Sequence, residues 1–272
     1  MNGPAESLLP PAPGPMLVLM YHGIHASRAD HGQFDPRYSV RPAQFAAQMH
    51  HLRQQRLAGW LPVTGQALVA PPGQGVQPMV LVTFDDGDAS NLGQALPILQ
   101  QTGLAAIFFI TRNFVGQRGM ITRAGLRELA DAGMVIGSHG LSHRFLNTLS
   151  PAALAIELAS SRDYLQQLTG RPVVLLSLPG GRGGSREIRA AHDAGYRSVL
   201  GSRPGINLDT PAGGVIERVV ISRQTTAVGF DQLLRWRGPA VWQQLARHRV
   251  LNWPKRVLGD RAYNRLRQVL VR

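Results

Sequence analysis

The sequence has no cysteine among its 272 residues. Disulfide bonds and thiolate metal ligands are therefore excluded, and any bound metal must be held by histidine, aspartate, glutamate or water. Long apolar runs are also missing near the start, where the run from Leu17 to Met20 is too short for a signal-peptide core or a membrane span. Because no basic residue precedes this run, we expect a cytoplasmic protein.

Hydrophobic residues make up 44% of the chain, which is enough for a sizeable core. Strand-like apolar runs alternate with helical patterns over residues 16–236. This alternation predicts parallel β/α units, and we expect an α/β fold with about seven parallel strands that close into a barrel. Residues 1–15 are rich in proline, glycine and alanine, so we expect a mobile N-terminal arm there.

Two adjacent aspartates end the strand that is expected over residues 80–84. Asp85 and Asp86 follow this apolar run directly, and Gly87 comes next. Adjacent carboxylates repel each other and aspartate has a low strand propensity, so this is a poor way to end a strand for stability alone. A bound cation would resolve the conflict.

A pair of histidines follows a later expected strand. The apolar residues 134–137 lead into His139 and His143. If both strands belong to one parallel sheet, their carboxyl ends meet at the edge where α/β proteins place their active sites. Two neutral imidazoles and one carboxylate would leave open positions on a divalent cation, and zinc suits these donors. A second carboxylate kept off the metal could take a proton from water.

In combination, these motifs resemble the NodB-type polysaccharide deacetylases, carbohydrate esterase family 4. The resemblance implies a distorted (β/α) barrel with fewer than eight complete units, and the hydrolysis of acetyl groups from N-acetylated sugars. It covers roughly residues 16 to 235. The matching segments are Met20-Tyr21-His22, Thr83-Phe84-Asp85-Asp86-Gly87, Ser138-His139-Gly140-Leu141-Ser142-His143, the Pro-Gly loop at 179–181 and Ala194-Gly195-Tyr196.

The same resemblance implies roles for single residues. Asp85 would be the general base. The metal would be held by Asp86, His139 and His143. The substrate carbonyl would lie on the metal and near a backbone N–H of the Pro-Gly loop, which together would stabilise the oxyanion. That loop consists of Pro179, Gly180 and Gly181.

Two features depart from the family pattern. Many members have an arginine two residues before the proline of the third motif, where it orients the base, but this chain has Ser177 there. Asp85 would then be held in another way. Many members also use a late histidine as the general acid, whereas His248 is the only histidine after Ile206. Relatives that act on exopolysaccharides share the Tyr-His start and use that early histidine, so we predict that His22 protonates the leaving amine.

The formal net charge of +13 is concentrated near the C-terminus. Residues 235–272 contain ten Lys and Arg residues and one acidic residue, with three tryptophans among them. Residues 237–272 are predicted to form a basic helical tail, and because interfacial helices often have this composition, an anionic membrane surface is one possible partner. The alternatives are a charged helix packed on the barrel and, less favoured because no recognised module accompanies the charge, a nucleic-acid-binding segment.

We therefore predict a metal-dependent hydrolase that removes N-acetyl groups from amino sugars of a polysaccharide or lipid-linked glycan. Three alternatives stay open. The protein could be a non-catalytic carbohydrate-binding relative, as Ser177 and the missing late histidine suggest. It could remove a formyl or another acyl group, or it could be a nucleic-acid-binding protein whose charge is its function.

Overall fold

The structure, a computed structural model, describes residues 14–27, 36–57, 66, 68, 78–208 and 214–250. The chain divides into two compact units, Met1–Gln224 and Thr225–Arg272. The expected N-terminal arm lies almost wholly outside the described residues. The larger part of the expected tail, residues 251–272, also lies outside them.

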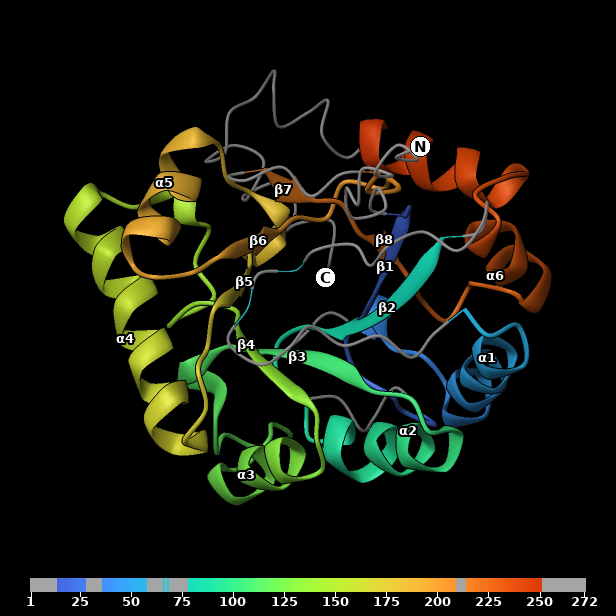
Figure 1. Ribbon diagram of the computed structural model, residues 1–272, viewed down its shortest axis with the longest axis horizontal. Helices are drawn as coiled ribbons and strands as arrows, with labels where there is room; N and C mark the ends of the chain where they lie inside the picture. Colours follow the sequence, from blue (N-terminus) through green and yellow to red (C-terminus); the bar gives the residue numbers. More distant parts are fainter. Residues whose placement is uncertain are drawn as a thin grey trace, which may run out of the picture. The chain divides into compact units, whose positions relative to one another are not determined.

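The first unit is built on one sheet of eight parallel strands, in the order β7-β6-β5-β4-β3-β2-β1-β8 (Figure 1). This confirms the predicted α/β class and the distorted barrel, with eight strands in place of about seven. The strands are β1 (Met16–Tyr21), β2 (Met79–Phe84), β3 (Ala106–Ile110), β4 (Val135–Ser138), β5 (Leu175–Ser177), β6 (Ser198–Leu200), β7 (Val215–Ile216) and β8 (Val219–Val220).

One short segment closes the sheet on itself. β7 pairs with β6 at one edge, and β8 pairs with β1 at the other. Only Glu217 and Arg218 separate β7 from β8, so this segment crosses between the two edges and joins them. The apolar run over residues 219–221 predicts β8, but β7 has only two residues and gives no comparable signal.

Helices lie outside the sheet, as the β/α alternation predicts (Figure 1). Ser150 caps α4 by accepting a hydrogen bond from the Ala153 N–H, and Gly170 ends this helix in the left-handed conformation. Pro97 lies inside a continuous helical stretch, because a π-helical turn (Asn91–Ala95) runs directly into α2 and marks the irregularity next to this residue, which has no N–H. The helices of this unit are α1 (Pro42–Gln54), α2 (Leu96–Thr102), α3 (Arg123–Asp131), α4 (Pro151–Thr169) and α5 (Ser185–Asp193).

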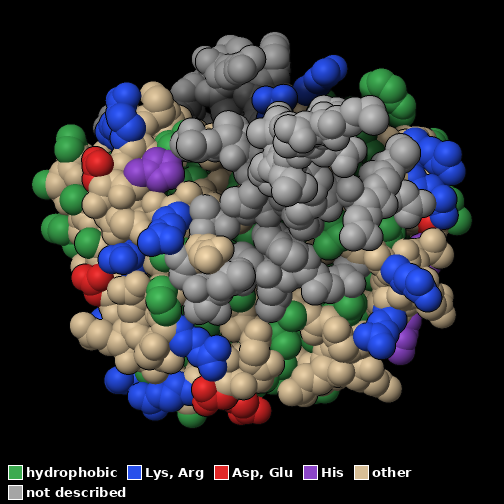
Figure 2. All heavy atoms as spheres, in the orientation of Figure 1, with side chains coloured by type: hydrophobic (Ala, Val, Ile, Leu, Met, Phe, Trp, Pro, Cys, Tyr) green, Lys and Arg blue, Asp and Glu red, His purple; other side chains and the backbone are tan. Residues whose placement is uncertain are grey.

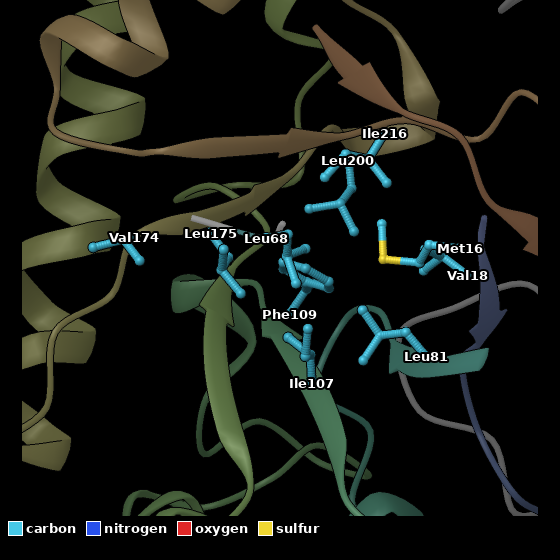
Figure 3. Packing of buried hydrophobic residues seen from close by; sticks show 10 residues of the cluster. All are labelled: Met16, Val18, Leu68, Leu81, Ile107, Phe109, Val174, Leu175, Leu200 and Ile216. Carbon is cyan, nitrogen blue, oxygen red and sulfur yellow. The ribbon is translucent and has the colours of Figure 1, made fainter. Parts of the chain in front are cut away.

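Alternate side chains of the strands fill the interior of the sheet (Figure 3). On β2, Leu81 belongs to this cluster, and steps of two residues then lead to Thr83 and Asp85. The core and the site are therefore successive layers of the same strand. The cluster consists of Met16, Val18, Leu68, Leu81, Ile107, Phe109, Val174, Leu175, Leu200 and Ile216.

The second unit contains α6 (Ala227–Leu234) and a further helix over residues 239–250. Pro239 begins that helix, as its position predicts. Trp242 is 70% exposed. None of the helices that the structure describes is long and apolar enough to cross a membrane.

Basic side chains are not confined to the C-terminal segment. Figure 2 shows Arg and Lys side chains around the margin of the face in view, with few acidic side chains between them. Exposed arginines of the first unit include Arg112, Arg118 and Arg144.

Gly137 on β4 provides a test of the interior packing. A Cβ at this position would lie 2.5 Å from the Phe109 ring and 3.2 Å from the Leu175 carbonyl oxygen. Gly137→Ala should therefore lower the free energy of unfolding by about 1–3 kcal/mol through overpacking. Gly93→Ala is the matched control, because no atom lies within 4 Å of its added Cβ. Urea unfolding measures both, and equal stability of the two variants would contradict this packing.

Candidate metal centre and active site

The chain turns sharply as it leaves β2. Asp85 and Asp86 are only 3% and 4% exposed. Asp86 has φ 75° and Gly87 has φ 87°, so two successive residues adopt the left-handed region. This conformation costs free energy for aspartate, and such residues cluster at functional sites, where the surrounding structure holds them in place.

The segment that carries the histidines is a loop. Gly140 has φ 82° and His143 has φ 60°, so the backbone does not turn helically between His139 and His143. α4 holds this loop through Glu157, whose carboxylate accepts hydrogen bonds from the Ser142 N–H at 2.6 Å and from the Ser142 hydroxyl at 2.8 Å. The positions of the imidazoles are therefore fixed from outside the sheet.

His139 presents its Nε2 atom to the carboxylates. Its Nδ1 atom lies 2.8 Å from the Ser177 carbonyl oxygen. Because a carbonyl oxygen can only accept, Nδ1 carries the proton and Nε2 carries the lone pair. Metal-binding histidines are oriented by this kind of backbone contact.

Asp86, His139 and His143 meet at one point. Asp86 Oδ1 lies 3.4 Å from His139 Nε2 and 3.2 Å from His143 Nε2. The three candidate ligand atoms all lie within 4.8 Å of one another. Asp86 Oδ1 is buried and accepts no hydrogen bond among the described residues. Electron-pair donors that converge in this way suit a divalent cation, and one carboxylate with two imidazoles matches known catalytic metal sites.

The protonation states favour the same use. Burial lowers the pKa of His139 to about 4, so this imidazole is neutral at neutral pH. Burial works against ionisation of Asp86, but the close contact with His143 and the charges of the neighbouring histidines outweigh it, and the pKa of Asp86 is lowered. A neutral imidazole and an ionised carboxylate are the forms that bind metal.

Asp85 has a different partner, which the sequence analysis missed. Arg218 Nη1 donates to Asp85 Oδ1 at 2.8 Å, and Arg218 Nη2 donates to Asp85 Oδ2 at 2.7 Å. Burial opposes ionisation of Asp85, but Arg218 and then His139 outweigh it and hold the pKa of this carboxyl well below its usual range. Asp85 is thus ionised and held next to the three candidate ligands, with Oδ2 at 4.0 Å from His139 Nε2.

His22 lies beside the two aspartates. It follows β1, which pairs with β2, and the Asp85 N–H donates to the Tyr21 carbonyl just before it. Its positive charge would lower the pKa of both Asp85 and Asp86, as expected for a neighbour. The ring stacks on Tyr38 at 4.9 Å, and its buried Nδ1 has no hydrogen-bond partner among the described residues.

The Pro-Gly loop follows β5, which is the neighbour of β4 in the sheet. Gly180 and Gly181 have φ 62° and 65°. A Cβ at Gly180 would lie 2.5 Å from the Phe145 ring, so glycine is required there for space as well as for backbone conformation. The predicted oxyanion loop thus packs against the segment that follows His143.

The comparisons with known proteins agree with this geometry. A sequence model of the family described as Polysaccharide deacetylase matches residues 73–199. A protein of Bacillus subtilis (strain 168) named as polysaccharide deacetylase YxkH is 27% identical over 218 residues, which are 80% of this chain and 75% of that protein. The chain contains a polysaccharide deacetylase domain. Enzymes of this family, carbohydrate esterase family 4, are hydrolases that act on N-acetyl amide bonds, so the predicted enzyme class is confirmed.

Solved structures of deacetylases share the fold. BC0361, a polysaccharide deacetylase from Bacillus cereus, is 26% identical with a TM-score of 0.69, covering 82% of this chain and 69% of that one. The Streptococcus pyogenes deacetylase PplD, solved in complex with acetate, covers 84% of this chain and 100% of its own, with a TM-score of 0.69 and 22% identity. At that identity PplD supports the fold alone.

The buried His139 makes stability depend on pH. Its pKa is about 4 in the folded chain against an ordinary value of 6.5, so between these values the unfolded chain binds a proton that the folded chain does not. Without metal, acidification from pH 7 to pH 5 should lower the free energy of unfolding by about 2 kcal/mol through this group. Urea unfolding with a chelator present measures it. His139→Asn should flatten the pH dependence by that amount, and an unchanged dependence would contradict the assignment.

Proposed function

We propose that the domain removes N-acetyl groups from amino sugars of a polysaccharide or lipid-linked glycan in a metal-dependent reaction. The observation that carries this proposal is the division between two adjacent carboxylates. Asp86 faces two imidazoles, whereas Asp85 faces a guanidinium. One can serve as a ligand while the other stays free to accept a proton.

Asp86, His139 and His143 would hold the metal, and zinc suits one carboxylate and two imidazoles. When bound, such an ion supplies Lewis-acid polarisation of the acetyl carbonyl and lowers the pKa of water. The orphaned Asp86 Oδ1 and the lone pair of His139 Nε2 support this assignment.

Asp85 is proposed as the general base. It would take a proton from the water that attacks the acetyl carbonyl carbon, while Arg218 keeps the carboxylate oriented. The C–N bond then breaks, and the products are acetate and the free amine of the sugar. The amine needs a proton as it leaves, and the reaction therefore also requires an acid.

The oxyanion donor is proposed to be the Gly180 N–H. The Leu178 N–H donates to Leu200, the Gly181 N–H donates to Leu178, and the Arg182 N–H donates to Pro179. Pro179 has no N–H. Among the described residues of this loop, Gly180 is thus the one whose amide is available to a ligand.

His22 is proposed as the acid. The support for this role is the proximity of its ring to both aspartates and the buried Nδ1 atom that no described group satisfies.

A non-catalytic, sugar-binding function was suggested by Ser177, which stands where many family members have an arginine. Arg218 removes that reason, because it supplies a guanidinium to Asp85 from another part of the chain.

Substitutions of the two aspartates should separate their roles. Asp86→Asn should reduce bound metal below about one tenth of the wild-type stoichiometry and abolish acetate release, because a ligand is lost. Asp85→Asn should retain the metal and lower kcat by about 10³-fold or more, because the base is lost. Elemental analysis and acetate release from N-acetylated chito-oligosaccharides measure both.

Formylated and propionylated oligosaccharides in the same assay test for another acyl group. A wild-type protein that binds metal and releases no acid from any of these substrates would contradict the proposed function. Loss of metal in Asp85→Asn with retention in Asp86→Asn would reverse the two roles.

The role of His22 has its own test. His22→Gln should lower kcat by about 10²-fold while metal content stays near the wild-type value, because the leaving amine loses its acid. A leaving group that needs no proton should depend less on His22, so an activated acetate ester should be hydrolysed at close to the wild-type rate. Near-normal turnover of the acetylated amine by His22→Gln would refute the role.

A further inference from the structure

We infer that Arg218 is a positioning residue that orients Asp85 from the segment between β7 and β8. In many family members, an arginine at the position of Ser177 has this role. This inference rests on the proposed function, because it concerns how the proposed base is held. It also predicts that residues 177 and 218 form an exchangeable pair.

Arg218 is completely buried, with 0% exposure. It lies in the two-residue link between β7 and β8, 133 positions from Asp85 in the sequence. A guanidinium is always charged, so complete burial is costly unless every donor finds an acceptor.

Every N–H group of Arg218 has such an acceptor. Nε donates to the Gly201 carbonyl at 2.7 Å. Nη1 donates to Asp85 Oδ1 and to the Thr83 hydroxyl, and Nη2 donates to Asp85 Oδ2 and to the Ser177 hydroxyl. A guanidinium has five donors, and all are used by groups on β2 and β5 and on the residues that directly follow β2 and β6. The orientation of Arg218 is therefore fixed by the barrel itself.

Ser177 is the complement of Arg218. Its hydroxyl accepts from Arg218 Nη2 at 2.7 Å and donates to Asp85 Oδ2 at 3.1 Å. A long side chain at 177 would need the space that the guanidinium occupies. The small residue in the third motif thus makes room for an arginine that enters from another strand, and it also bridges that arginine to the carboxylate.

The arrangement assigns different tasks to two adjacent aspartates. Both oxygens of Asp85 lie on the guanidinium, so this carboxylate cannot turn toward the imidazoles without losing two charge-assisted hydrogen bonds. Asp86 has no such restraint, and its Oδ1 lies against His139 and His143. Arg218 thereby keeps the base off the metal.

The test compares Arg218→Lys with Arg203→Lys in the full-length protein. Lysine keeps the charge but cannot hold both oxygens of Asp85, so kcat on chito-oligosaccharides should fall by about 10²-fold, with KM within about threefold. Bound metal per chain should stay at the wild-type value. Arg203 is the matched control, because it pairs with Glu217 of the same segment but is 74% exposed. Its substitution should leave kcat within about twofold.

The exchange variant, which combines Ser177→Arg with Arg218→Ser, should have a kcat at least about tenfold higher than that of Arg218→Ser alone. The reason is that a guanidinium again reaches Asp85, now from β5. A purely structural role of Arg218 would not be rescued in kcat by arginine at 177. No recovery in a folded exchange variant would overturn the equivalence of the two positions.

Ser177→Ala covers the case in which the Arg218 variants do not fold. It removes one bridging hydroxyl from a small side chain, so the fold should persist and kcat should fall by about three- to tenfold at constant KM. An unchanged kcat in Ser177→Ala, or equal kcat in Arg218→Lys and Arg203→Lys, would overturn the inference while wild-type acetate release still supports the proposed function. Absence of acetate release by the wild type would instead remove the proposed function.

Discussion

The ion pair between Arg218 and Asp85 is the interaction on which the site depends. Two adjacent carboxylates at the end of one buried strand repel each other, and each needs its own source of positive charge. Arg218 supplies this charge to Asp85 from within the barrel. A cation held together with the two imidazoles would supply it to Asp86. The two partners make neighbouring, chemically identical groups suited to different tasks.

The closed parallel sheet brings these groups together. Parallel strands present their carboxyl ends at one edge, so residues far apart in the sequence can share a site. His22 follows β1, the aspartates follow β2, and His139 follows β4. Arg218 can reach Asp85 because β7 and β8 lie on opposite edges of the sheet and the link between them crosses the opening. Closure of the barrel and orientation of the base are thus achieved by the same segment.

Much of this was predictable from the sequence, because local patterns carry the signal. Ser150 and Gly170 mark the ends of α4, and Asp85, Asp86, His139 and His143 stand directly after apolar runs. The departure at Ser177 also predicted that Asp85 is held in another way. Its actual partner could not be found, since Arg218 is one basic residue among 29 and stands beside a two-residue strand. Its role depends on a contact across 133 positions, which periodicity does not reveal.

Anomalous diffraction from a crystal of the zinc-loaded protein tests the central claim most directly. The account predicts one ion bound by an oxygen of Asp86 and by Nε2 of His139 and His143, with Asp85 still on Arg218 and outside bonding distance of the ion. Zinc bound by Asp85, or an ion at this edge of the barrel that lacks either imidazole, would contradict it.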